Sequence, residues 1–282
     1  MAHLAETTHV LRVKNRSGNV HDGKASLPFL RDLWSQLTMS RLGSGQLRFR
    51  MDGAFFRQDV LKWLTARGVG YGIKVPFYHW LDLQQYIRAA PAWTRVAPDI
   101  SGFIVPAAAT PWGQPLWVAI YRKKVAHRTA KNFQLDLFDP NDGSYEYSAI
   151  TSNLHFTVAN LWYFMAGRGN HEKTIAQLKG GLAFHTVPTM AYAANSAWQQ
   201  LVILTHNLLT NFQLDAGAAP RRRSRKHTTL TVLETIQTLR FTLFHRAAAL
   251  LCPGGRPTLR LRRNKATEQR YRRIEVAVTR VA

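Results

Sequence analysis

Two acidic and two basic residues of this sequence have the types and spacing needed to act on a phosphate ester. Three of them, Arg168, Glu172 and Lys179, lie close together in the sequence. On a helix that turns about 100° per residue, Glu172 lies about 40° and Lys179 about 20° from Arg168, so the three would share one face. Carboxylates bind hard cations such as Mg²⁺, whereas Arg and Lys donate hydrogen bonds to phosphate oxygens. The same spacing is also common in exposed helices that only form surface ion pairs.

The other acid, Asp52, follows a segment with the pattern of a β-strand. Between residues 47 and 52, Leu, Phe and Met alternate with Arg, Arg and Asp, and Gly53 interrupts the pattern. Open α/β sheets carry their chemistry at the carboxyl ends of strands. We therefore expect Asp52 either at a reactive sheet edge or as an ordinary turn former after a strand.

The first quarter of the chain alternates between strand and helix patterns. Apolar residues alternate in strand-like segments, and they recur at helical spacing between these segments, in the order 9–14, 27–37, 47–52, 56–64 and 69–75. This order predicts an α/β fold with helices packed on a sheet. We assign residues 1–74 to the first part of such a core.

The next segment, residues 75–145, contains seven of the twelve Pro residues among short apolar runs. Pro is rare inside central strands and common at edges and loops, so we predict a β-rich insertion with strands at 117–124 and 132–138 and a further strand from Tyr145. Trp side chains in this region and before it are expected mainly in the core, with a wedge into DNA as the alternative. They are Trp63, Trp80, Trp93, Trp112 and Trp117.

Residues 146–214 return to helical spacing and form the second part of the predicted core. Helices are expected at 154–165, at 168–179 with a stop at Gly180 and Gly181, and at 190–212. Gly167 and Gly169 weaken a helix at Arg168, and Asn170 can cap a helix that begins after it. Arg168 would then lie in the turn before that helix. The last of the three helices would turn an apolar surface inward, formed by Trp198, Leu201, Val202, Leu204, Leu208 and Leu209.

The segment 215–282 is strongly basic, with sixteen Lys and Arg against three Glu after Asp215. Its densest cluster consists of Arg221, Arg222, Arg223, Arg225 and Lys226. Such a run is often only a solvated arm. In a chain this basic, we expect the cluster to contact phosphates.

The whole chain of 282 residues carries a formal charge of +22 and is 46% hydrophobic. It can therefore build a core, and its charge favours a polyanionic partner, with nucleic acid first and an anionic membrane second. Because the sequence has neither an apolar run of about 18 residues nor an apolar signal core, we expect no membrane attachment and a cytoplasmic, nucleoid-associated protein. The single Cys252 excludes an internal disulfide and a cysteine-based zinc cluster.

The order of these motifs resembles that of the DDE-type insertion-sequence transposases of bacteria. The resemblance rests on Asp52 at a strand end, the β-rich insertion, Thr-Ser-Asn-Leu at 151–154, and then Arg168, Glu172 and Lys179. More narrowly, the chain resembles the insertion-sequence family numbered thirteen-eighty in Arg-Ser-Gly-Asn-Val at 16–20, Phe-Arg-Met-Asp-Gly-Ala-Phe at 49–55, Gly-Val-Gly-Tyr-Gly-Ile-Lys at 68–74 and Tyr-Glu-Tyr at 145–147. Several motifs in order are more specific than any one of them.

This resemblance implies a ribonuclease-H-like core and DNA transposition by metal-dependent phosphodiester cleavage and strand transfer. Asp52 would match the second catalytic acid and Glu172 the third, both as ligands of Mg²⁺, which Mn²⁺ can replace. Arg168 and Lys179 would match residues that hold phosphates at the transposon end. The implied partners are double-stranded DNA, as terminal inverted repeats and as target, and a second copy of the chain in a homodimer on paired ends.

Two features depart from the family pattern. The signature Tyr is expected three residues before Arg168, where this sequence has Met165, with Tyr163 and Phe164 beside it. The first catalytic Asp is expected on a strand upstream of residues 10–20. The acids before Asp52 do not fit that place; they are Glu6, Asp22 and Asp32. We therefore expect a truncated transposase that lacks its N-terminal region and first strand and is catalytically incomplete.

Two other functions compete with this interpretation. A non-catalytic protein derived from a transposase could bind double-stranded DNA with the same basic surfaces, and the missing Asp favours it. A basic RNA-binding protein is the third alternative, but the sequence lacks the ribonucleoprotein aromatic motif and a GXXG clamp in a clear domain context.

Overall fold

The structure is a computed structural model that describes residues 1–15, 23–39, 47–90, 92–124, 144–222, 224–225, 227–245, 247–262 and 264–280. The chain divides into two compact units. The sheet unit comprises Arg16–Arg168, and the helical unit comprises Met1–Asn15 together with Gly169–Ala282. Among the described helices, none has the length and apolar character needed to cross a bilayer.

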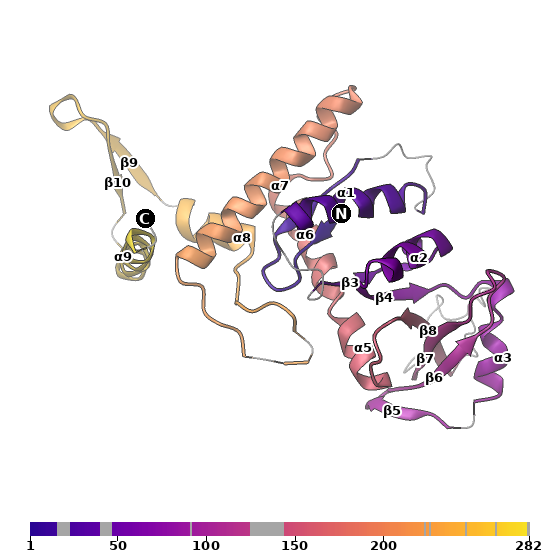
Figure 1. Cartoon of the computed structure of the whole chain (residues 1–282). Helices are drawn as coiled ribbons and strands as arrows, with labels where there is room; N and C mark the ends of the chain where they lie inside the picture. The colour runs from indigo at the N-terminus through magenta and orange to yellow at the C-terminus, as the bar shows by residue number, and fades with distance from the viewer. Residues whose placement is uncertain are drawn as a thin grey trace. The chain divides into compact units, whose positions relative to one another are not determined.

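The sheet unit is built on six strands in the order β3-β4-β8-β7-β6-β5 (Figure 1). They are β3 (Arg48–Met51), β4 (Gly70–Val75), β5 (Thr94–Ala97), β6 (Ile100–Ala108), β7 (Leu116–Lys124) and β8 (Tyr145–Ser152). β3 and β4 are parallel, with Arg50 opposite Gly72, whereas the other neighbours are antiparallel. The parallel pair requires a crossover, which contains helix α2 (Gln58–Ala66). The sheet is therefore mixed, as expected for an α/β protein with an added antiparallel part.

Helices cover both faces of this sheet because its strands alternate their side chains between two cores. In β7, Val118 and Ile120 join the core under α1 (Ser26–Met39) and α2. Ala119 and Tyr121 join the opposite core under α5 (Val158–Ala166). Two short helices precede β5, namely η3 (His79–Leu81) and α3 (Leu83–Arg88). The predicted strand at 132–138 lies outside the described residues.

Helix α5 lies very close to the sheet. A Cβ on Gly72 of β4 would come within 2.8 Å of Met165 Sδ, so the helix can approach only because this residue is Gly. The hydroxyl of Tyr121 donates to the Val158 carbonyl at 2.8 Å, and burial raises the pKa of this Tyr. Arg50 of β3 donates to the Phe164 carbonyl at 3.1 Å. These contacts fix the end of α5, from which Arg168 follows, against the strand that ends at Asp52.

Replacing Leu161 by Ala tests how much this packing contributes. Leu161 is fully buried in the core between α5 and the sheet. We expect the substitution to lower the free energy of unfolding by about 2–5 kcal/mol, because it removes buried methyl groups and leaves a cavity. Urea denaturation measures the change. The matched control is Asn160→Ala, on the exposed side of the same helix, which should change stability by less than about 0.5 kcal/mol. Equal effects of the two substitutions would contradict this packing.

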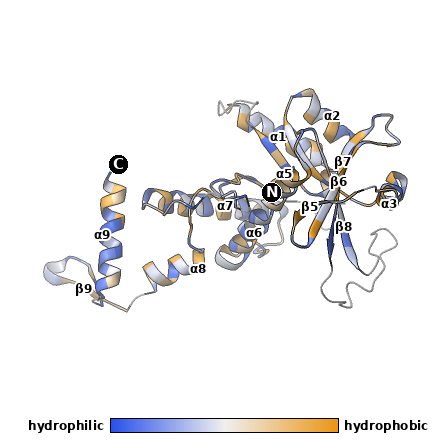
Figure 2. Ribbon diagram, turned by 90° about the horizontal axis from the view of Figure 1, so that it is seen from below, coloured by the Kyte–Doolittle hydropathy of each residue, from blue (hydrophilic) through white to orange (hydrophobic). Residues whose placement is uncertain are grey.

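The helical unit contains a two-stranded sheet and two long helices. Strands β1 (Ala2–His3) and β2 (Val10–Arg12) form the sheet, and α6 (Gly169–Leu182) and α7 (Tyr192–Asp215) pack beside it. Val10, Leu178, Val202 and Ile203 form their common core. The remaining elements are α8 (Ile236–Leu239), the π-helix η4 (Arg240–Phe244), β9 (Ala248–Leu251), η5 (Pro253–Gly255), β10 (Thr258–Leu261) and α9 (Lys265–Thr279). Hydrophilic residues line much of α9 (Figure 2).

The strand predicted at 9–14 exists as β2, but it does not join the six-stranded sheet as expected. Side chains of α7 bind it instead. The Val10 amide donates to Asn207 Oδ1, and Asn207 Nδ2 donates to the Val10 carbonyl, both at 2.9 Å. His9 Nε2 lies 2.7 Å from Asn211 Oδ1. The Asn207 amide thus satisfies the backbone N–H and C=O of Val10, which a neighbouring strand would otherwise bind. Strand β2 can therefore stay outside the larger sheet.

Two predictions about the helices of this unit were wrong. Leu201, Leu204 and Leu208 of α7 are exposed, because the helix turns Val202, Ile203, His206 and Thr210 toward β2 and α6. Helix α6 does not stop at its two Gly residues but continues to Leu182. A Cβ on Gly181 would come within 2.7 Å of Ile236, so this Gly serves helix packing and not termination.

His206 predicts a pH dependence of stability. Burial lowers the pKa of His206, despite the hydrogen bond to the Thr8 carbonyl that favours its charged form. In the unfolded chain, His206 binds a proton near pH 6.5, whereas in the folded protein it binds one only at lower pH. Stability should therefore fall as the pH drops below about 6.5, with a slope of at most about 1.4 kcal/mol per pH unit. Urea unfolding of the wild type and of His206→Gln at several pH values measures this. Parallel profiles would contradict the prediction.

Candidate active site

Asp52 occupies the carboxyl end of β3, as the sequence predicts. Its Oδ1 accepts a hydrogen bond from the Gly53 amide at 2.8 Å and so caps the short helix η2 (Gly53–Phe55). A Cβ on Gly53 would come within 3.0 Å of the Pro76 ring, so Gly lets the loop after β4 approach. The Asp52 side chain is 57% exposed. Its carboxylate is therefore positioned by the backbone and still open to a ligand.

Arg168 lies beside this carboxylate, with NH1 3.4 Å from Asp52 Oδ2. Arg168 is in the turn between α5 and α6, so it does not share a helical face with Glu172 and Lys179. The alternative placement that Gly167 and Gly169 indicated is confirmed. An exposed pair of this kind contributes only about 0–1 kcal/mol to stability. The pair places a guanidinium, which is suited to phosphate oxygens, next to a carboxylate, which is suited to a hard cation.

Glu172 lies in the first turn of α6 and Lys179 in its last turn. Both side chains are exposed, and they lie two turns apart on one helical face. Glu172 belongs to the helical unit and Asp52 to the sheet unit. The proximity of these two acids therefore stays a prediction.

The residues near the expected signature Tyr have structural partners. Met165 is buried against Gly72 of β4, so it acts as a core residue. The hydroxyl of Tyr163 donates to the Val96 carbonyl at 3.4 Å. Phe164 packs in the same core, and the Arg50 guanidinium lies 5.3 Å from the centre of its ring. These contacts explain why an aromatic pair precedes the turn that carries Arg168.

The predicted basic cluster is described only in part. Arg222 and Arg225 are exposed, as expected for a solvated arm, whereas Arg221 is half-buried. Arg223 and Lys226 lie outside the described residues. Within the helical unit, Arg221 lines a pocket, which the sequence did not predict because the residues around it come from distant segments.

An exposed aromatic cluster that the sequence pattern did not indicate follows β4. Tyr78 and Trp80 are 41% and 42% exposed, and their rings stack at 5.3 Å. Phe56 and Trp112 lie beneath them. The expectation that Trp80 lies in the core was therefore wrong, whereas Trp63 is buried as predicted. The sequence signal was the aromatic run that follows Pro76.

The residues around Asp52 suit a hard cation in part. A solvent-accessible carboxylate oxygen is a ligand that Mg²⁺ and Mn²⁺ accept. Within the described ranges, however, no group of three His, Cys, Asp or Glu side chains could hold a metal ion. Asp52 therefore needs ligands beyond its immediate neighbours.

The fold and this site first define a class: an α/β protein with a mixed sheet, whose exposed acid at the end of a parallel strand is suited to phosphate chemistry. The family model for the transposase DDE domain group 1 matches residues 2–282, so the chain belongs to this family. Membership implies DNA transposition and DNA binding, and DDE transposases generally use divalent metal ions. A search of curated proteins gave no significant match.

Proposed function

We propose that this protein acts at the ends of an insertion sequence of the family numbered thirteen-eighty, by metal-dependent phosphodiester cleavage and strand transfer. The observation that carries the proposal is the Asp52 carboxylate at a strand end, 3.4 Å from Arg168. An acid and a guanidinium at this distance can act on one phosphate from two sides. The carboxylate would bind a metal ion that contacts the phosphate, and the guanidinium would donate hydrogen bonds to the phosphate oxygens.

Asp52 and Glu172 would hold the metal ion, and Mg²⁺ or Mn²⁺ would supply charge stabilisation at the reacting phosphate. The backbone amide of Gly53 keeps the Asp52 carboxylate in place. In this proposal the core is ribonuclease-H-like, and the added antiparallel strands form its insertion.

Basic residues would hold the DNA. Arg168 would contact the phosphate nearest the acid, and Lys179 would contact one near Glu172. Arg222 and Arg225 project from an exposed segment and would contact the backbone farther from the reacting bond. The net charge of +22 would attract the duplex over a distance. We propose that two copies of the chain act together on paired ends, with terminal inverted repeats and target DNA as substrates.

The number of acids limits the expected activity. Two carboxylates hold a divalent cation less tightly than the three carboxylates of a complete DDE site. The rate of DNA cleavage depends on this bound ion. We therefore propose that this sequence by itself cleaves slowly. The second candidate function, a non-catalytic protein that binds double-stranded DNA, is favoured by the lack of a three-acid group in the described parts of the chain.

A nicking assay separates the two functions. The full chain is incubated with a duplex carrying the inverted repeat that flanks its gene, with Mg²⁺, with Mn²⁺ or with EDTA, and strand breaks are mapped on a sequencing gel. Breaks at the repeat end that require metal support the transposase. Binding of the repeat without cleavage, together with no detectable Mn²⁺ binding, would overturn the catalytic proposal in favour of the second function.

DNA affinity should depend steeply on salt, because each phosphate contact releases condensed counterions. For about six contacts, we expect the affinity to fall by about 10³-fold between 50 and 200 mM salt. Changing both Arg222 and Arg225 to Gln should reduce the slope of log affinity against log salt by about two. Fluorescence anisotropy measures these slopes. The control changes both Lys62, exposed on α2, and Arg67, the exposed residue that follows this helix, to Gln, and it should leave the slope unchanged.

A further inference from the structure

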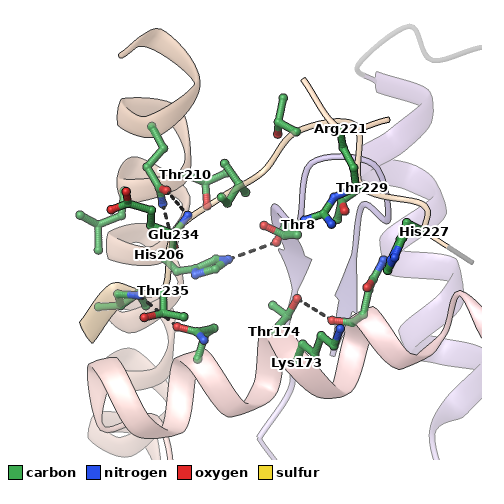
Figure 3. Close-up of a pocket in the computed structure, with 17 residues that line it drawn as sticks. Thr8, Lys173, Thr174, His206, Thr210, Arg221, His227, Thr229, Glu234 and Thr235 are labelled. Atoms are coloured by element: carbon green, nitrogen blue, oxygen red, sulfur yellow. Dashed lines mark hydrogen bonds between the residues drawn. The ribbon is translucent and has the colours of Figure 1, made fainter. Parts of the chain in front are cut away.

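The helical unit contains a pocket of about 220 Å³ whose walls come from four segments (Figure 3). Helix α6 supplies Asn170, Lys173, Thr174 and Gln177, and α7 supplies His206, Leu209, Thr210 and Gln213. Arg221 and residues from 227–236 close one side, and Thr8 of the β1–β2 turn closes another. This volume is several times that of one water molecule.

Several wall residues have only a structural role. Gln177 accepts from the Ile236 amide at 3.0 Å, and Gln213 accepts from the Glu234 amide at 2.7 Å. Asn170 donates to the Thr228 hydroxyl at 2.6 Å. These three amides hold the segment 228–236 against the helices. The pocket is therefore a built feature of the unit and does not depend on a single loop contact.

Other polar groups of the wall lack partners. Thr231 Oγ1, Arg221 Nε and His206 Nδ1 are buried and make no hydrogen bond. His206 is itself only 6% exposed, and its other ring nitrogen lies 3.1 Å from the Thr8 carbonyl. A buried polar group without a partner typically costs about 1–3 kcal/mol. Two of these groups, Arg221 Nε and the Thr231 hydroxyl, can donate, and together they indicate a ligand that accepts hydrogen bonds. His206 Nδ1 is an acceptor, because the other ring nitrogen donates to the Thr8 carbonyl.

The charge of the pocket indicates an anion. Within the described residues, Lys173 and Arg221 form no ion pair with a carboxylate. Glu234 is the acid of the wall, and Arg270 neutralises it at 2.7 Å. Two uncompensated cations therefore face the cavity, with Thr hydroxyls between them as donors. Leu209, Leu233 and Ile236 provide an apolar wall.

We propose that this pocket binds a phosphate monoester. Such a group carries a charge of about −1.5 to −2 and three acceptor oxygens, which matches two cations and several hydroxyls better than a carboxylate or a phosphodiester does. Arg221 binds two of the oxygens, Lys173 compensates the second charge, and the Thr231 hydroxyl donates to the third. The apolar wall contacts the organic part of the ester. The ligand is either a small free ester or the 5′-phosphate of a DNA end. This inference does not rest on the proposed metal chemistry.

The first experiment titrates the full chain with inorganic phosphate and with adenosine monophosphate at constant ionic strength and follows the melting temperature. We expect both to raise it at about 10 mM ligand. Arg221→Gln, Lys173→Gln and Thr231→Val should each weaken binding by about tenfold or more. Thr231→Val should melt at the wild-type temperature or above without phosphate, because the lost hydroxyl has no partner, so weaker binding cannot be ascribed to misfolding. The matched control, Arg272→Gln on α9, should bind phosphate like the wild type.

The second experiment identifies the source of the phosphate. The wild type and Arg221→Gln are titrated with one duplex in two forms, with a 5′-phosphate and with a 5′-hydroxyl. Tighter binding of the phosphorylated duplex by the wild type, lost in the variant, assigns the pocket to DNA ends. Equal binding of both duplexes, together with the response to adenosine monophosphate, assigns it to a free ester. The proposal is overturned if phosphate does not raise the melting temperature, or if it does so equally in the wild type and the three pocket variants.

Discussion

Replacement of Asp52 by Asn is expected to reduce metal-dependent nicking of repeat DNA by about 10³-fold, which corresponds to about 4 kcal/mol of transition-state stabilisation. Asn keeps an oxygen that can accept from the Gly53 amide, so the cap of η2 and the fold should persist. The substitution therefore removes only the negative charge and, with it, the proposed metal ligand. DNA binding should be unchanged or slightly tighter, because a negative charge beside Arg168 is removed.

The matched control is Asp82→Asn. Asp82 is also an exposed Asp of the sheet unit, and it has a positive φ that Asn adopts readily. The Asp82→Asn substitution should leave nicking unchanged. If the wild type nicks too slowly to measure, Mn²⁺ binding followed by electron paramagnetic resonance replaces the assay, and Asp52→Asn should weaken binding by about 10-fold or more. Wild-type nicking and Mn²⁺ binding in Asp52→Asn would contradict a role for this acid.

Replacement of Glu172 by Gln should have a similar effect on nicking, again about 10³-fold. The side chains are nearly equal in size, and Glu172 is exposed near the start of α6, so stability should change by less than about 1 kcal/mol. Glu275→Gln, at an exposed position of α9 in the same unit, is the matched control and should be silent. Loss of nicking in both variants would point to a general effect of charge and not to a site.

A metal-directed cleavage experiment tests whether the two acids share one ion. Fe²⁺ that occupies a Mg²⁺ site reacts with added hydrogen peroxide, which gives Fe³⁺, hydroxide and a hydroxyl radical that cuts the nearby backbone. In the wild type we expect cuts near residue 52 and near residue 172 in the same sample. Both cuts should be lost in Asp52→Asn and also in Glu172→Gln. Cuts near only one position would mean that the two acids do not form one site, and the proposed catalytic function would then fail even if the protein binds DNA.

Much of the local structure was predictable because it depends on short-range patterns. Alternation of apolar and polar residues predicted the strand that ends at Asp52, and helical spacing predicted α2 and α5. The glycines around Arg168 indicated that this residue precedes α6. Each signal lies within about ten residues of the feature it predicts.

Long-range partners were not predictable in the same way. The sequence indicated a strand at β2 but not that Asn207 would pair with it and keep it outside the larger sheet. It indicated a helix at α7 and correctly placed Val202 inside, but it wrongly placed Leu201, Leu204 and Leu208 there. Polar contacts from His206 and Asn207 help to set the rotation of this helix. Hydrophobic spacing alone does not contain this information.

The sequence by itself determined the chemical inventory of this DDE transposase family member: a large positive charge, an acid after a strand, and an acid and two cations in or next to one helix. Only the tertiary structure decided that Arg168 lies beside Asp52 and that Arg221, Lys173 and His206 line one pocket. The physical reason is that residue types and local periodicity are fixed by neighbours in the chain. The pairing of distant side chains depends instead on how whole elements pack, which no short segment specifies.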